Sequence, residues 1–194
     1  MNSIFTRVTL AMMVITVCHP EVGLSQTKVA SWLDEAKPAS WNLPGLSIPA
    51  APRMDGAVDP RCRTLTRPAE LEQDRGLQNH GWDLIGPYQG GWQILVIEGT
   101  ASYDGMCRPR QYQAFVFVRG VFAGTLSPQL MDSRSDGALT RVTLQSKNRL
   151  TAGFLRYAAT DPLCCPSKIT SVEFEIAPDA PVVRPVSAST SPTR

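Results

Sequence analysis

The chain has 194 residues, with 19 Lys or Arg against 17 Asp or Glu, so its net charge at neutral pH is only +2. The basic residues form no run, and aromatic residues do not alternate with them in a repeated pattern. Both features argue against a nucleic-acid partner, and we expect none.

The first 25 residues have the layout of a secretory signal peptide. One basic residue, Arg7, precedes an apolar run over 8–17, and the small Ser25 stands where a signal peptidase would cleave. The run has about ten residues, roughly half of what a membrane-spanning helix needs. We therefore predict a cleaved signal peptide over 1–25 and a periplasmic or secreted bacterial protein.

Cys18 follows the apolar run, as a lipidated cysteine would. The three residues before it, Ile15 to Val17, lack the small side chains expected in front of such a cysteine. We expect association with a membrane only if Cys18 is lipidated.

Composition divides the remaining chain into three parts. Residues 26–60 and 178–194 are rich in Pro, Ala and Ser and lack sustained apolar periodicity. Such segments are typical of a linker and of a disordered tail, respectively. The residues between them, 61–177, number about 120, which is enough for a single domain with one core.

Within this domain a helix can begin at Pro68, because proline is tolerated in a first turn and Glu70 and Glu72 suit a helix N-terminus. It should end near Gly81. Seven short β-type runs follow, separated by turn residues. They cover 82–85, 92–103, 111–119, 122–126, 138–145, 150–157 and 170–176.

No second helix interrupts this series, so parallel βαβ units are not expected. The predicted fold is α+β: an antiparallel, meander-like sheet of six or seven strands, with the one N-terminal helix packed on a face. Four aromatic residues, Trp92, Phe115, Phe117 and Phe154, are assigned to the core rather than to a ligand site.

Cleavage of the signal would leave four cysteines: Cys62, Cys107, Cys164 and Cys165. Four cysteines allow three disulfide connectivities. A bond between Cys164 and Cys165 would close a strained ring across one peptide bond. We expect instead that one of them pairs with Cys62 and the other with Cys107, in either combination. Zinc sites space their cysteines by about two to four residues, so we predict neither metal nor cofactor.

His80 is the one histidine that the mature chain would contain. No Gly-x-Ser-x-Gly sequence marks a nucleophilic serine, and a helix C-terminus favours a cation, so we assign no catalytic residue. The alternative is a periplasmic hydrolase that uses His80 with a nearby Ser or with Asp104, Asp132 or Asp136.

Asp104 and Asp136 each precede a glycine and are typical of turns. Arg134 stands between Asp132 and Asp136 and is predicted to pair with them locally. The candidate surface or binding residues are Trp82, Tyr88, Tyr103, Asp104, Arg134 and Asp136.

Two stretches carry a family resemblance. FVFVRGVFAGTLSP, at 115–128, and RYAATDPLCCPSK, at 156–168, resemble the LppP/LprE-type bacterial lipoproteins, and the resemblance covers roughly residues 80–176. It implies an exported envelope protein and brings no activity and no catalytic residues with it.

Together these observations favour an exported, non-enzymatic envelope domain held by two disulfides, which acts by binding or by structural association. Its partner would be an unknown envelope protein or a small ligand. Besides the hydrolase, a third hypothesis is a small-molecule-binding sheet with a pocket between Trp82 and Trp92.

Overall fold

The structure is a computed structural model that describes residues 30–54 and 59–193. The predicted signal peptide and Cys18 lie outside these residues. The helical elements are η1 (Trp32–Asp34), η2 (Pro60–Leu65) and α1 (Glu72–Asn79). The strands are β1 (Asp83–Gly91), β2 (Ile94–Tyr103), β3 (Pro109–Val118), β4 (Val121–Thr125), β5 (Leu139–Ser146), β6 (Arg149–Arg156), β7 (Lys168–Ile176) and β8 (Val183–Pro192).

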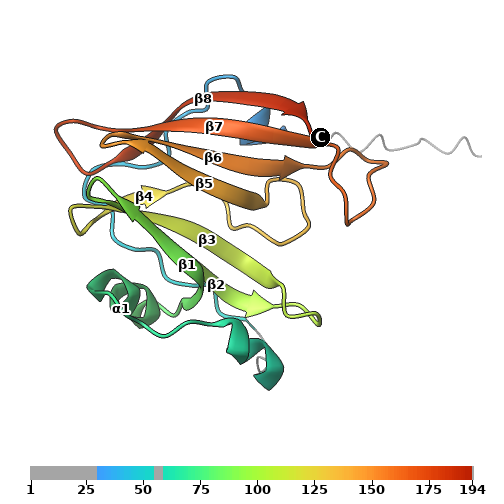
Figure 1. The fold of residues 1–194 in the computed structure, drawn as a ribbon, viewed down its shortest axis with the longest axis horizontal. Coiled ribbons are helices and arrows are strands. Elements are labelled where there is room, and N and C mark those ends of the chain that lie inside the picture. The colour runs from blue at the N-terminus through green and yellow to red at the C-terminus, as the bar shows by residue number, and fades with distance from the viewer. Residues whose placement is uncertain (1–29, 55–58, 194) are drawn as a thin grey trace, which may run out of the picture.

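The strands form two antiparallel sheets of four rather than one sheet of six or seven. Sheet A has the order β1-β2-β3-β4 and sheet B the order β5-β6-β7-β8, and Figure 1 shows them as separate layers. All seven predicted runs overlap β1 to β7, and each sheet is a meander. The predicted single sheet is wrong because the chain leaves β4 at Thr125 and starts a second sheet at Leu139. The described fold is mostly β.

The core explains why two sheets form. One hydrophobic cluster joins the facing sides of both sheets, with Val96 and Val116 from sheet A and Phe154 and Phe174 from sheet B. A second cluster covers the other side of sheet A, where Leu77 of α1 packs with other buried side chains. Strand β3 is therefore buried on both faces, as its continuous apolar sequence requires.

Residues 183–192 form β8, so the predicted disordered tail is wrong over this stretch. The strand pairs with β7 along its length, and Val183 is fully buried. Its sequence, VRPVSASTSP, is polar and contains Pro185, which lies where the register shifts. A proline at a bulge is compatible with an edge strand, and an edge strand needs few apolar side chains.

The segment 30–54, predicted as part of a linker, is anchored on the domain. Leu33 is buried in the core, and the Trp32 ring packs edge-on against the rings of Trp41 and Phe154. Apart from η1 the segment has no regular secondary structure, as its Pro-rich composition predicts. The composition does not show that the segment packs against the domain.

Asn42 is the most deeply buried polar residue of this segment, with 2% exposure. Its side-chain amide donates to the carbonyl of Thr125 in β4 (2.9 Å) and to that of Val183 in β8 (2.9 Å), and its oxygen accepts from the Thr125 N–H (3.0 Å). One side chain therefore ties the end of sheet A to the edge of sheet B. We call it the Asn42 clamp.

Helix α1 begins four residues later than predicted, because the carboxylate of Asp74 folds back onto the preceding turn. It accepts from the N–H groups of Glu70 and Leu71, both at 3.0 Å, and forms two bonds with the guanidinium of Arg67 (2.6 and 2.7 Å). Burial alone would raise the pKa of Asp74. These hydrogen bonds outweigh it, and the pKa lies below the ordinary 3.8.

We expect this arrangement to make the protein sensitive to acid. A carboxylate whose folded pKa is lowered adds stability that is complete above its unfolded pKa of about 4 and is lost as the pH falls through the folded value. Asp74→Asn should therefore lose less stability than the parent between pH 5 and pH 2. Urea unfolding at a series of pH values measures this, and parallel curves for the two proteins would contradict it.

Candidate functional site

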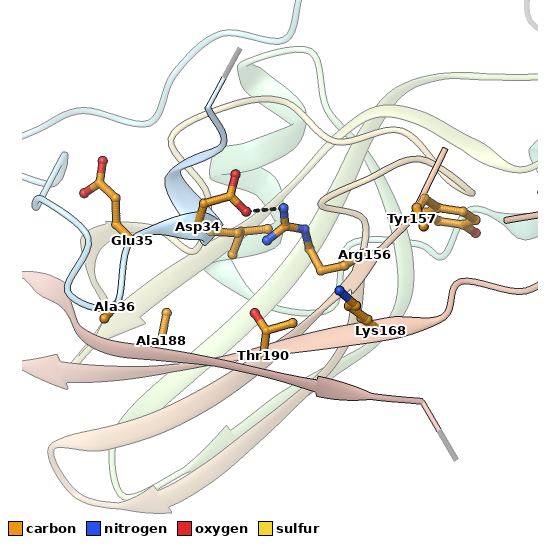
Figure 2. Close-up of a pocket in the computed structure, with 10 residues that line it drawn as sticks. Asp34, Glu35, Ala36, Arg156, Tyr157, Lys168, Ala188 and Thr190 are labelled. Atoms are coloured by element: carbon orange, nitrogen blue, oxygen red, sulfur yellow. Dashed lines mark hydrogen bonds and ion pairs between the residues drawn. The ribbon is translucent and has the colours of Figure 1, made fainter. Parts of the chain in front are cut away.

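A cavity of about 560 Å³ opens beside sheet B, where the ends of β6, β7 and β8 meet the N-terminal segment. Figure 2 shows Asp34, Glu35 and Ala36 on one side, Ala188 and Thr190 of β8 below, and Lys168 and Tyr157 opposite. The side chain of Arg156 forms part of the wall, between Asp34 and Lys168. We call it the Arg156 cavity.

Arg156 is only 7% exposed, and its guanidinium is held from three directions. Nε donates to Asp136 (2.9 Å), Nη2 to Asp34 (2.5 Å) and Nη1 to the hydroxyl of Thr170 (3.3 Å). These partners come from the β4–β5 connection, from η1 and from β7. Since the carboxylates of Asp34 and Asp136 both pair with the guanidinium, the buried cation is neutralised and fixed in place.

We expect Arg156→Gln to lower the free energy of unfolding by about 2–3 kcal/mol, because it leaves two carboxylates close together without their cation. Arg149→Gln is the matched control, since Arg149 forms a half-exposed pair with Glu173 and such pairs contribute at most about 1 kcal/mol. Urea unfolding at neutral pH compares the two. Equal losses would show that the buried cluster is no more important than a surface pair.

The rim of the cavity carries opposite charges. Lys168 is exposed on one side, and the carboxylates of Asp34 and Glu35 lie on the other. The hydroxyl of Thr190 adds a polar group and contacts the hydroxyl of Thr170 at 2.7 Å. Within residues 30–54 and 59–193 no group of three or more His, Cys, Asp or Glu side chains could hold a metal ion. The arrangement suits recognition of a small polar molecule.

The predicted disulfide pairing is wrong. Cys62 in η2 is bonded to Cys107 in the β2–β3 turn, with 4.9 Å between their Cα atoms, a separation typical of a bridge. With these two joined, Cys164 and Cys165 in the β6–β7 loop are paired with each other. Their loop lies beside the Arg156 cavity, where the Tyr157 hydroxyl donates to the Leu163 carbonyl (3.2 Å).

Trp82 and Trp92 do not share a pocket. Trp82 is 1% exposed, packs edge-on against Phe115 at 5.0 Å between ring centroids, and donates from Nε1 to the Pro49 carbonyl (2.7 Å). Trp92 is 56% exposed in the β1–β2 turn. The pocket between them is therefore not formed, and the assignment of Trp92 to the core is also wrong.

Three of the other candidate residues are engaged in local structure. Tyr88 lies under the guanidinium of Arg67, 5.3 Å from the ring centroid. Tyr103 packs against the core shared by the two sheets, and its buried hydroxyl has no hydrogen-bond partner in the described part of the chain. Burial, with a smaller effect of Asp83, raises the pKa of Tyr103 to about 12. Asp104 accepts from the Arg108 side chain, and this bond lowers its pKa to about 2.

Arg134 is exposed in a left-handed turn conformation, with φ of 59°. The predicted local pairs with its neighbours are not formed, because Asp132 pairs with Arg110 (3.6 Å) and Asp136 with Arg156 (2.9 Å). Of the six candidate residues, only Asp136 touches the wall of the Arg156 cavity.

His80 caps α1 on the outer side of sheet A, where its Nδ1 lies 2.8 Å from the Gly76 carbonyl oxygen. Asp136 is bonded to Arg156 on the sheet B side, so the fold does not bring these two residues together. Asp104, Asp132 and Asp136 pair with Arg108, Arg110 and Arg156, and within the described residues no hydrogen bond joins His80 to any of these three carboxylates.

Sequence reasoning missed Asp34, Arg156, Lys168 and Thr190. One signal was present: Leu150, Ala152 and Phe154 alternate along β6 as inward-facing residues, and Arg156 continues that alternation. A charged residue at an inward position of a strand needs partners and marks a buried polar cluster.

The fold and the cavity define a two-sheet antiparallel β domain, bridged between Cys62 and Cys107, with a charged recess at one end of sheet B. The model of the LppP/LprE lipoprotein family matches residues 92–179, which confirms the predicted resemblance. The matched stretch runs through β2 to β7 and includes Arg156 and Lys168, but neither Asp34 nor β8. Searches of curated proteins and of solved structures give no match.

The matched family is described as one of lipoproteins. In the part of the chain that the structure describes, no helix is long and apolar enough to cross a membrane.

Proposed function

We propose that the protein is a non-catalytic binding module of the bacterial cell envelope, periplasmic or secreted, and that the Arg156 cavity is its ligand site. The observation that carries the proposal is the fixed guanidinium in the cavity wall. Arg156 already pairs with Asp34 and Asp136, so its role is to hold the wall of the recess in shape. The groups that contact a ligand are then those on the rim: Lys168, Glu35 and Thr190.

The charges on the rim select the class of ligand. Lys168 offers an ammonium to a carboxylate, and Glu35 on the other side offers a carboxylate to an ammonium. Thr190 adds a hydroxyl between Ala188 and Lys168. A small molecule with both charges, such as a free amino acid or a dipeptide, meets these groups. The volume of about 560 Å³ is within the range of small-molecule sites.

The test is the shift in melting temperature of the mature protein with a panel of free amino acids and dipeptides at millimolar concentration. A ligand that binds only the folded state raises the melting temperature. We expect at least one compound to do so, and Lys168→Gln to abolish the shift while Arg141→Gln, which removes an exposed cation of β5, retains it. No shift with any compound, or a shift that Lys168→Gln leaves intact, would contradict the proposal.

Attachment to a membrane through Cys18 stays a prediction. The intact mass of the protein exported by its own signal tests it, because lipidation adds the mass of acyl chains and keeps Cys18 in the mature chain.

A further inference from the structure

A second cavity, of about 310 Å³, lies where four hairpin connections meet. Its lining comes from the β1–β2 turn (Trp92), the β3–β4 turn (Arg119), the β5–β6 turn (Lys147) and the β7–β8 connection (Pro178). Both sheets contribute to it. It shares no lining residue with the Arg156 cavity, so it is a separate feature of the molecule. We call it the Trp92 cavity.

The backbone at Trp92 is unusual for that residue. Trp92 and Gln93 are the two residues between the paired Gly91 and Ile94, and both have positive φ, 48° and 70°. Turns of this kind favour Asn-Gly, because side chains larger than those of Asn or Asp are disfavoured in the left-handed region.

The fold does not account for this tryptophan. The side chain is 56% exposed, so its burial offers little to offset the unfavourable backbone. A strained residue that adds little to the core is a reason to look for a role in recognition. An exposed indole at the mouth of a cavity presents a flat apolar face to a ligand.

The charges around this cavity have one sign. Arg119 and Lys147 line it and form no ion pair within the described part of the chain, and none of its lining residues is acidic. Asp179 follows Pro178 but does not line the cavity. The side chains of Gln93 and Asn148 add amides, while Val118 and Ile176 supply apolar surface.

We propose that the Trp92 cavity binds an acidic sugar unit of an envelope glycan. The indole stacks on the C–H face of the sugar ring, Arg119 and Lys147 face its carboxylate, and the amides of Gln93 and Asn148 bond its hydroxyls. The indole, the two cations and the two amides that line the cavity then each meet a complementary group on the ligand. The inference is independent of the Arg156 cavity and of the ligand proposed for it.

Calorimetric titration of the mature protein with trigalacturonate, and with galactotriose as the neutral counterpart, tests the proposal. We expect trigalacturonate to bind more tightly than galactotriose, and increasingly so at low salt. Trp92→Ala should weaken binding by about tenfold or more, since exposed aromatic anchors carry much of such binding. The double variant Arg119→Gln with Lys147→Gln should remove the preference for the acidic sugar.

The double variant Arg63→Gln with Arg141→Gln is the matched control, because it removes the same charge from exposed positions elsewhere. It should bind as the parent does. Absence of binding at millimolar trigalacturonate, or binding that the Trp92 and Arg119/Lys147 variants leave unchanged, overturns the proposal. Binding to phosphatidylglycerol vesicles but not to either sugar overturns it too, in favour of a membrane surface as the occupant.

A second variant separates recognition from folding. Trp92→Asn with Gln93→Gly places the favoured turn sequence at this position, so the melting temperature should rise by a few degrees while sugar binding is lost. A lower melting temperature would show that Trp92 stabilises the fold, and the argument from strain would then fail.

Discussion

Gly124→Ala should destabilise the protein by about 4 kcal/mol or more, at the upper end of what single substitutions do. Gly124 has φ of +125°, which L-residues rarely adopt, and a Cβ atom there would overlap the side-chain amide of Asn42. The Asn42 clamp would have to open, and its buried hydrogen-bonding groups would lose their partners.

Urea unfolding of this variant beside Gly105→Ala measures the effect. A Cβ at Gly105 meets nothing within 4 Å, and this glycine does not have a positive φ, so the control should stay within about 1 kcal/mol of the parent. In Asn42→Ala the space beside Gly124 is vacant, and the further cost of Gly124→Ala should shrink. A mild effect of Gly124→Ala in the parent would mean that Asn42 moves aside easily and that the clamp is weak.

Removal of the Cys62–Cys107 bridge is the second large effect we expect. The bond joins residues 45 apart in the sequence. Closing a loop of that length lowers the entropy of the unfolded chain, which stabilises the folded state by about 4 kcal/mol at 25 °C. Cys62→Ser with Cys107→Ser should lower both the urea midpoint and the melting temperature under oxidising conditions.

The other cysteine pair provides the control. Cys164 and Cys165 are neighbours in the sequence, so a bond between them closes no long loop and restricts the unfolded chain very little. Cys164→Ser with Cys165→Ser should therefore melt close to the parent. If instead this variant lost as much stability as the Cys62/Cys107 variant, Cys164 or Cys165 would have to be bonded to a distant cysteine rather than to its neighbour.

Much of the fold was predictable because alternation is a local property. In β7, Val172, Phe174 and Ile176 are buried and the residues between them are less so, and this pattern can be read directly from the sequence. The division into two sheets was not predictable, because it depends on the connection from Thr125 to Leu139 and on which strands meet across the core. Neither property can be predicted from a short stretch of the sequence.

Less of the candidate site was predictable. Asp34 lies 122 residues from Arg156 in the sequence, inside a segment whose composition is that of a linker. Only the folded chain shows that the two are bonded. Trp92 was visible, but its aromatic side chain was assigned to the core, and its exposure follows from a turn whose backbone conformation its residue types do not favour.

The Asn42 clamp has a consequence for the order in which the protein matures. Asn42 precedes β1 to β8, while its partners Thr125 and Val183 lie 83 and 141 residues further along the chain. The N-terminal part of a chain is synthesised first, so Asn42 is made long before either partner. Sheet A can pair once Thr125 has been made, but the second half of the clamp forms only after β8 follows. The clamp can therefore close only when nearly the whole chain has been made.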